Sequence, residues 1–208
     1  MPSGTVGGVG HWDEVYTTKA VDDVSWFQPD PVVSFRLVTS VATPASRIVD
    51  VGAGASLLVD RLHAAGFRHL TVADVSGAAL DVVRERLGAA AADVEFVVAD
   101  VTAWQPPHPF DVWHDRAVFH FMYDDADRAR YLDTMRSAVP VGGRVVVATF
   151  AEDGPERCSG LLVRRYSETT LSAAFGDGFV RQHSERQVHL TPWGSEQPFT
   201  WVVLVRAA

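Results

Sequence analysis

Hydrophobic positions between residues 47 and 150 follow two alternating patterns. Short runs of adjacent apolar, often β-branched residues predict buried strands, and apolar residues spaced three or four apart after several of these runs predict helices. The predicted strands cover about residues 47–52, 69–73, 94–99, 110–114 and 144–150. Strands that alternate with helices in this way predict a parallel sheet with helices on both faces.

The last quarter of the chain has a different pattern. A loop over residues 151–165 and a short helix over 167–175 precede two long strand-like runs, 179–190 and 199–206. The turn sequence Thr191-Pro192-Trp193-Gly194-Ser195 separates these runs, so we expect an antiparallel hairpin. Together with five parallel β-α units, this hairpin predicts an α/β protein with a Rossmann-like, seven-stranded mixed sheet.

Polar residues mark the starts of the predicted helices. Ser56 and Ser76 each precede an apolar periodic segment and can accept a hydrogen bond from a first-turn N–H group. Asp124 or Asp125 is placed to do the same before a helix that turns Tyr131 inward. These three starts predict one helix after each of the first, second and fourth strands.

The N-terminal part divides into two segments. Residues 1–10 are mostly Gly, Ser, Val and Pro without periodicity, so we expect them to be disordered. Residues 11–40 predict a helical flap, which either packs its aromatic residues on the core or closes over a ligand with Trp26 and Phe27 near the mouth. Residues 11–208 then form a single domain, with a cofactor-binding core over 45–150 and a substrate loop and hairpin over 151–208.

Composition narrows the class of protein. The 208 residues are 47% hydrophobic and 21% charged, which is ordinary for a globular protein. No apolar run is long enough to span a membrane and no signal pattern is present, so we expect a cytoplasmic protein. The net charge of −8 argues against a nucleic-acid partner, and Lys19, the only lysine, is not part of a phosphate-binding loop. Cys158 is the only cysteine, which excludes an intramolecular disulfide.

A glycine turn follows the first predicted strand. Gly52 and Gly54 lie between this strand and a helical segment, where residues without a Cβ allow a sharp turn and a close approach of the backbone to a ligand. Asp74 ends the second predicted strand, 22 residues after Gly52. A carboxylate at about this spacing is placed to accept hydrogen bonds from ribose hydroxyls.

The residues of the turn distinguish between nucleotide ligands. A nicotinamide dinucleotide site needs a small residue where this chain has Leu57. The pattern of Asp50, Gly52 and Gly54 instead resembles motif I of the class I S-adenosylmethionine-dependent methyltransferases, with Ser56 in place of the third glycine. The resemblance covers about residues 45–206 and implies that the two glycines pass beneath the methionine moiety, with Asp50 near its amino group.

The same resemblance implies the rest of the cofactor site. Asp74 would hold both ribose hydroxyls and Val75 would lie against the adenine. Asp100, after the third predicted strand, would accept a hydrogen bond from the adenine amino group, and Val101 would provide a neighbouring backbone N–H. The alternative for each aspartate is a structural role as a turn or helix cap.

The run from His114 to His120 follows the fourth predicted strand, beside the expected cofactor. If the reaction needs a base, we expect it to be His120 or His114, oriented by Asp115, because histidine titrates near neutral pH. An ion pair between Asp115 and Arg116 that only fixes the loop is an alternative. A zinc site from the two histidines and Asp115 is a further one, but the spacing matches no metal signature, so we predict no metal.

This run is similar to two branches of the class I superfamily. Asp115-Arg116-Ala117 and Asp127-Arg128-Ala129-Arg130-Tyr131 resemble motifs of thiopurine-type small-molecule methyltransferases. The Asp115 and Phe119 positions also match protein lysine methyltransferases that modify elongation factors, and Trp12–Tyr16 resembles an N-terminal segment of both branches. The candidate substrate-binding residues are Trp26, Phe27, Arg116, Phe119, Arg164 and Tyr166.

We therefore expect a methyltransferase that uses S-adenosyl-L-methionine, forms S-adenosyl-L-homocysteine and methylates sulfur, nitrogen or oxygen of a small molecule. The alternatives are a protein lysine methyltransferase, a non-catalytic module that binds the cofactor and, more distantly, a nicotinamide-dependent reductase. We expect no nucleic-acid or membrane partner, and a monomer or a homodimer.

Overall fold

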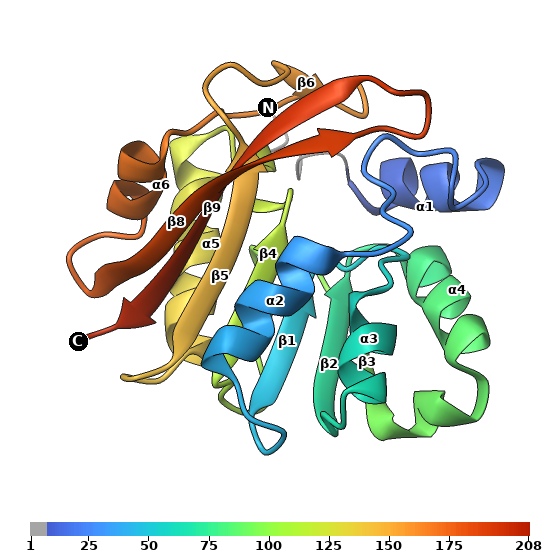
Figure 1. Ribbon diagram of the computed structural model, residues 1–208, viewed down its shortest axis with the longest axis horizontal. Coiled ribbons are helices and arrows are strands. Elements are labelled where there is room, and N and C mark those ends of the chain that lie inside the picture. The colour runs from blue at the N-terminus through green and yellow to red at the C-terminus, as the bar shows by residue number, and fades with distance from the viewer. Residues whose placement is uncertain (1–7) are drawn as a thin grey trace.

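A seven-stranded sheet with the order β3-β2-β1-β4-β5-β9-β8 forms the centre of the protein in a computed structural model that describes residues 8–208 (Figure 1). Five neighbouring strands are parallel, as predicted. They are β1 (Arg47–Val51), β2 (His69–Asp74), β3 (Val94–Val98), β4 (Val112–Arg116) and β5 (Arg144–Phe150). The fourth strand lies two residues further along the chain than predicted, which brings Asp115 and Arg116 into the sheet.

The C-terminal hairpin completes the sheet. Strand β9 (Glu196–Arg206) runs antiparallel to β5, and β8 (Phe179–Leu190) pairs antiparallel with β9 at the edge. This arrangement confirms the predicted mixed sheet with its antiparallel hairpin, although β9 begins three residues earlier than expected. Strand β5 is almost entirely buried because β4 and β9 flank it and helices cover both of its faces.

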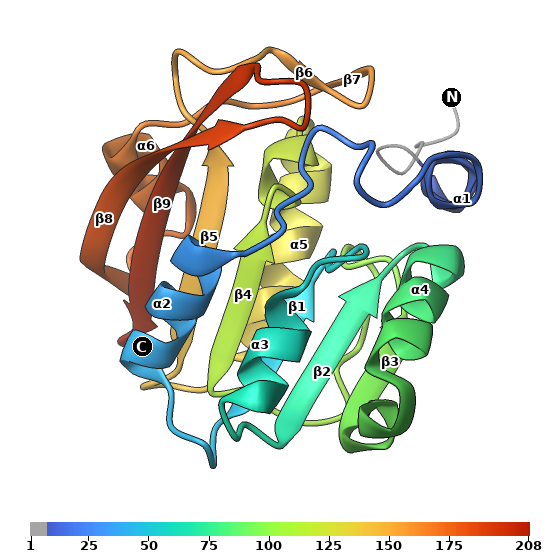
Figure 2. The ribbon, with the colours of Figure 1, turned by 45° about the vertical axis from the view of Figure 1, so that its right-hand side comes forward.

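Helices lie on both faces of the sheet. Figure 2 shows α2 (Val32–Val41) and α3 (Leu58–Ala64) in front of it and α5 (Asp125–Ala138) and α6 (Glu168–Ala174) behind it. Helix α4 (Gly77–Leu87) and the short 3₁₀ helix η1 (Gly88–Asp93) connect β2 to β3. The segment between β3 and β4 contains no helix, so the β-α alternation is interrupted at this one connection.

Three helix starts differ from the prediction. At α5, Asp124 occupies the N-cap but its side chain accepts no capping hydrogen bond. Helix α1 (Val9–Thr18) already includes residues 9 and 10, which were expected to be disordered, whereas residues 1–7 lie outside the described part. Helix α3 has Leu57 at its N-cap, but the Ser56 hydroxyl still accepts a hydrogen bond from the Leu58 N–H at 3.1 Å. Ser76 caps α4 as predicted, by accepting from the Ala79 N–H at 3.2 Å.

Three short elements lie above the carboxyl ends of the parallel strands. The 3₁₀ helix η2 (Phe119–Phe121) follows β4, and β6 (Arg157–Cys158) pairs with β7 (Leu161–Leu162) in the loop after β5. Helix α1 lies at this same edge of the sheet (Figures 1 and 2). Among residues 8–208, no helix is both long enough and apolar enough to cross a bilayer.

Candidate functional site

Two adjoining hollows lie at the carboxyl edge of the sheet, where ligands bind in open α/β folds. The larger, of about 120 Å³, lies where β1, β2 and β4 end, and the smaller, of about 60 Å³, lies between the glycine turn and the segment before α2. Gly52, Tyr16, Trp26 and Arg116 line both hollows. These four residues therefore form the boundary between them.

The glycine turn has the geometry that the sequence predicts. Gly52 and Gly54 have φ values of 59° and 53°, in the left-handed region that favours glycine. A Cβ on Gly52 would lie 2.0 Å from Val118 Cγ2, and a Cβ on Gly54 would lie 2.1 Å from the Tyr16 hydroxyl. Both positions thus need glycine for conformation and for space.

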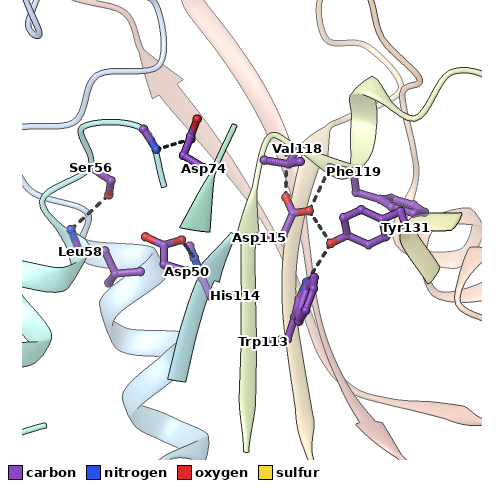
Figure 3. Close-up of polar contacts among 11 residues, drawn as sticks. Asp50, Ser56, Leu58, Asp74, Trp113, His114, Asp115, Val118, Phe119 and Tyr131 are labelled. Atoms are coloured by element: carbon purple, nitrogen blue, oxygen red, sulfur yellow. Dashed lines mark hydrogen bonds and ion pairs between the residues drawn. The ribbon is translucent and has the colours of Figure 1, made fainter. Parts of the chain in front are cut away.

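Asp74 is buried at the end of β2, in the wall of the larger hollow. Its Oδ2 accepts a hydrogen bond from the Gly54 N–H at 2.8 Å (Figure 3). Its Oδ1 accepts one from the Ser76 N–H, also at 2.8 Å. Burial raises the pKa of Asp74 to about 6, although the two N–H groups act in the opposite direction. Each oxygen retains a second lone pair with which it can accept from a ligand hydroxyl.

The residues expected around the adenine line the same hollow. Val75, Asp100 and Val101 contribute to its wall beyond Asp74. Asp100 Oδ1 accepts from both the backbone N–H and the hydroxyl of Thr102, at 2.9 and 2.8 Å. These bonds fix the turn after β3. Asp100 therefore caps this turn, which was its alternative role, and it also lines the hollow.

Asp50 and His114 form a buried pair on neighbouring strands β1 and β4, where they are direct partners in the register. His114 Nδ1 lies 2.7 Å from Asp50 Oδ1 (Figure 3). Because a carboxylate only accepts, Nδ1 must carry the proton. His114 Nε2 is buried and has no hydrogen-bond partner among residues 8–208. Both residues line the smaller hollow.

Arg116 is the last residue of β4. Its Nη1 donates to the Trp26 carbonyl oxygen at 3.0 Å, and its guanidinium carbon lies 4.7 Å from the centre of the Phe199 ring. Although the residue as a whole is half-buried, Nε and Nη2 are sealed from solvent and lack a partner in the described part of the chain. Burial lowers the pKa of Arg116 to about 10, so the group is still charged at neutral pH.

Asp115 does not have the role predicted for it. Its carboxylate accepts from the N–H groups of Val118 and Phe119 and from the Tyr131 hydroxyl, at 2.9, 3.0 and 2.6 Å (Figure 3). The side chain is fully buried, and burial raises the pKa of Asp115 to about 6. It therefore orients the loop after β4 and not a histidine, and these bonds take the place of the ion pair with Arg116 that was the alternative.

His120 is also placed differently from the prediction. It is fully buried in η2, where its Nδ1 accepts a long, 3.4 Å hydrogen bond from the Phe150 N–H, and it lines neither hollow. Burial and the nearby Arg116 charge lower the pKa of His120 to about 3. A base must reach the substrate, so the structure argues against His120 in that role.

Three of the candidate substrate residues lie away from the hollows. Phe119 packs in the core, with its ring centre 5.0 Å from that of Tyr131 and 5.7 Å from that of Tyr166. Arg164 faces outward, where it donates to the Tyr123 carbonyl at 2.6 Å and pairs with Asp125 at 3.0 Å. These contacts give Phe119, Tyr166 and Arg164 a structural role.

The N-terminal segment covers the site. Trp12, Tyr16 and Trp26 line the larger hollow, and Trp26 Nε1 donates to the Tyr16 hydroxyl at 3.2 Å. Asp13 accepts from the Ser76 hydroxyl at 2.6 Å and so holds α1 against the start of α4. Trp26 and Phe27 both line the smaller hollow, and Trp12 and Trp26 also pack against the hydrophobic core.

Several lining residues were not predicted. Most come from the loops after β3, β4 and β5, and only Ala117 and Asp127 belong to motifs that the sequence analysis named. They are Thr102, Trp104, Ala117, Val118, Phe121, Met122, Asp127 and Cys158. Burial raises the pKa of the Cys158 thiol to about 12, so it stays protonated. Within the described residues, no group of three or more His, Cys, Asp or Glu side chains is arranged to hold a metal ion.

Residues 48–143 match the methyltransferase domain family. This match covers the glycine turn, Asp74 and the loop after β4, and the sheet order is that of the same fold. Over these residues the chain has a methyltransferase domain. No curated protein matches the sequence at a significant level.

Solved structures with the same fold include three similar chains. The N-methyltransferase NodS of Bradyrhizobium japonicum, solved with S-adenosylhomocysteine, has a TM-score of 0.74 at 15% identity, over 95% of this chain and 99% of that one. The 1,6-didemethyltoxoflavin N1-methyltransferase of Burkholderia thailandensis, solved with bound 1,6-didemethyltoxoflavin and S-adenosylhomocysteine, has a TM-score of 0.69 at 21% identity, over 98% of this chain and 85% of that one. A third similar structure has a TM-score of 0.73 at 17% identity, over 96% of this chain and 93% of that one. It was described under the conversion of a disulfide bond into a thioacetal group during echinomycin biosynthesis.

Proposed function

We propose that this enzyme methylates a sulfur, nitrogen or oxygen atom of a small molecule with an apolar, ring-shaped part. The observation that carries the proposal is the aromatic wall of the larger hollow next to the expected cofactor residues. Trp12 lies between Trp26 and Phe121, with ring centres 5.9 and 5.3 Å away, and Met122 adds a flexible apolar side chain. Such a wall suits a flat ring better than an extended polar peptide.

The residues at the end of β2 and β3 suit the nucleoside part of S-adenosylmethionine. Asp74 would accept from the ribose hydroxyls, because its two oxygens are fixed by backbone N–H groups and each has a lone pair left. Val75 would pack against the adenine, Asp100 would accept from its amino group, and the Val101 N–H would donate to the ring. Gly52 lines both hollows, so the chain that joins ribose to methionine would pass beside it.

The bound cofactor supplies an electrophilic methyl group, so the protein must align the acceptor and keep water out. Asp115 orients the Val118 and Phe119 backbone, and this places the Val118 side chain on Gly52 at the meeting point of the two hollows. Trp26 and Tyr16 cover that point from the other side. The acceptor atom would therefore be enclosed by apolar and aromatic groups.

Neither candidate histidine supports a base in the larger hollow. His120 does not reach it, and His114 lines only the smaller one. We therefore propose an acceptor that needs no histidine base, such as a thiolate or a neutral nitrogen with a free lone pair. An oxygen acceptor would need one of the lining carboxylates, Asp74, Asp100 or Asp127, to receive its proton.

The test is incubation of the enzyme with methyl-labelled S-adenosylmethionine and a lysate of its source cells, followed by separation of protein from small molecules. We expect label in the small-molecule fraction, and its loss with Asp74→Ala but not with the exposed Asp133→Ala as matched control. Label that stays on protein and withstands acid would replace the proposal with protein lysine methylation. Cofactor binding without label in either fraction, even when small-molecule extracts of differently grown cells are supplied, would favour a non-catalytic module.

A further inference from the structure

The side chain of Arg116 extends from β4 away from the glycine turn. Its guanidinium carbon lies 4.7 Å from the centre of the Phe199 ring, and Phe199 belongs to β9, two strands from β4 on the side opposite to β1. Cys158, on β6, lies close enough to act on the pKa of Arg116, next after burial. Arg116 and Cys158 both line the larger hollow, so they form its end beyond β4.

The guanidinium of Arg116 has two donors without an acceptor in the described chain. Nη1 donates to the Trp26 carbonyl oxygen at 3.0 Å, and the remaining edge, formed by Nε and Nη2, is sealed from solvent. Within residues 8–208, no ion pair joins Arg116 to a carboxylate, and Asp50, which also acts on its pKa, is bonded to His114 instead. Buried charged donors without an acceptor are costly, so this free edge suits a ligand.

The groups near this free edge are donors as well. His120 Nδ1 accepts from the Phe150 N–H, so the proton of the neutral imidazole is on Nε2, which is buried without an acceptor among residues 8–208. Burial and the charge of Arg116 lower the pKa of His120 to about 3 and keep it neutral. Burial also raises the pKa of the Cys158 thiol to about 12, so it stays protonated. A positive charge among donors favours a ligand with negative charge and acceptor atoms.

A carboxylate has the shape that the free edge needs. The N–H groups on Nε and Nη2 of Arg116 are parallel, and they match the two oxygens of a carboxylate in a two-pronged contact. Trp26 and Phe121 line the same hollow and offer apolar rings for the part of the ligand that is attached to the carboxylate. A ring with a carboxylate therefore satisfies both the charge and the aromatic wall.

We propose that the methyl acceptor is an aromatic acid, whose carboxylate binds the free edge of Arg116 while its ring packs on the aromatic wall of the larger hollow. Arg116 is then the residue that selects acidic acceptors. The carboxylate anchors the molecule, and the methylated atom is the sulfur, nitrogen or oxygen of the proposed function. The proposal names the substrate class of that function and rests on it.

Two ligands can supply a carboxylate at this place, the acceptor and the amino-acid part of the cofactor. The positions of Phe199 and Cys158 favour the acceptor, because β9 and β6 lie on the side of β4 that is away from the glycine turn. The test is therefore made on the complex with S-adenosylhomocysteine, in which the carboxylate of the cofactor is already bound.

The test is the calorimetric binding of benzoate and benzamide to the full chain saturated with S-adenosylhomocysteine. Benzamide has the same ring and a similar shape without the charge. We expect benzoate to bind at least about tenfold more tightly than benzamide, and Arg116→Gln to remove this advantage by weakening only benzoate. Arg116→Lys, which keeps the charge but not the two-pronged edge, should keep part of the advantage. Arg181→Gln, at an exposed position of β8, should keep all of it.

Three results would overturn the selection of acids and leave the aromatic hollow as it is. They are equal binding of benzoate and benzamide to the wild-type complex, an advantage of benzoate that Arg116→Gln retains, and a loss of S-adenosylhomocysteine affinity of about tenfold or more in Arg116→Gln. The last result would assign the free edge to the carboxylate of the cofactor. If neither benzoate nor benzamide binds to the wild-type complex, the hollow does not accept a ring, and the proposed function fails as well.

Circular dichroism of each variant checks that the fold is retained. If Arg116→Gln does not fold, the ratio of the two affinities in Arg116→Lys decides, because a ratio equal to that of the wild type would overturn the two-pronged contact.

Discussion

Acidification from pH 8 to pH 5 should weaken the binding of 5′-methylthioadenosine, because Asp74 has to be ionised to accept from both ribose hydroxyls. A protonated carboxyl keeps its proton on one oxygen and loses one of the two acceptor positions. Burial holds the pKa of Asp74 at about 6 in the ligand-free protein, so the change of charge falls inside this pH range. The nucleoside has no group that titrates there.

The size of the effect follows from that pKa. At pH 8 nearly all molecules have the ionised carboxylate, whereas at pH 5 only about one in eleven does. The dissociation constant should therefore rise about tenfold, equivalent to about 1.4 kcal/mol, and proton release should accompany binding at the lower pH. Asp74→Asn should bind weakly at both pH values, with no such slope.

Titration calorimetry in two buffers of different ionisation enthalpy measures both the affinity and the protons released. A wild-type affinity that stays constant between pH 8 and pH 5, or a slope that Asp74→Asn retains, would refute the assignment. The unfolding free energy offers an independent check. Because the pKa of Asp74 lies above its ordinary value of 3.8, this carboxyl favours folding below about pH 4, and that contribution of about 2–4 kcal/mol is lost as the pH rises through 6.

Two further substitutions test the supports of the site. Tyr131→Phe removes a donor to Asp115 and the acceptor of the Trp113 indole N–H. Urea unfolding should therefore show that the free energy of unfolding falls by about 2–4 kcal/mol. A fall of less than about 0.5 kcal/mol would mean that this network does not hold the loop. Gly54→Ala places a Cβ against the Tyr16 hydroxyl at a positive φ, so S-adenosylhomocysteine should bind at least about tenfold more weakly. Unchanged affinity and unchanged melting temperature would contradict that geometry.

The five parallel strands could be predicted because each follows a short, mainly apolar run, and the hairpin could be predicted from the turn sequence between its two long strands. The glycine turn and the acidic residues after β2 and β3 were equally predictable, since all of them lie at the ends of strands. Parallel strands bring these ends to one edge of the sheet, so position along the chain is enough to place Gly52, Asp74 and Asp100 together. Side-chain directions did not need to be known.

The directions of the side chains after residue 113 explain the part of the site that the sequence did not predict. His114, Asp115 and Arg116 were treated as one cluster, but the strand turns Asp115 to the face of α5 while its two neighbours face the opposite side. The predicted end of β4 at His114 concealed this alternation. The short 3₁₀ turn that buries His120 and the outward course of the chain at Arg164 depend on packing between distant segments, which no local pattern reveals.

Tyr16 and Trp26 border both hollows, so they face whatever binds in either one. A ligand that shifts these side chains on one side changes the walls offered to the ligand on the other side. Such coupling is reciprocal at equilibrium: the factor by which S-adenosylhomocysteine alters the affinity for the methyl acceptor must equal the factor by which the acceptor alters the affinity for S-adenosylhomocysteine. Two aromatic residues of the N-terminal segment would thus set how strongly cofactor exchange and substrate binding depend on each other.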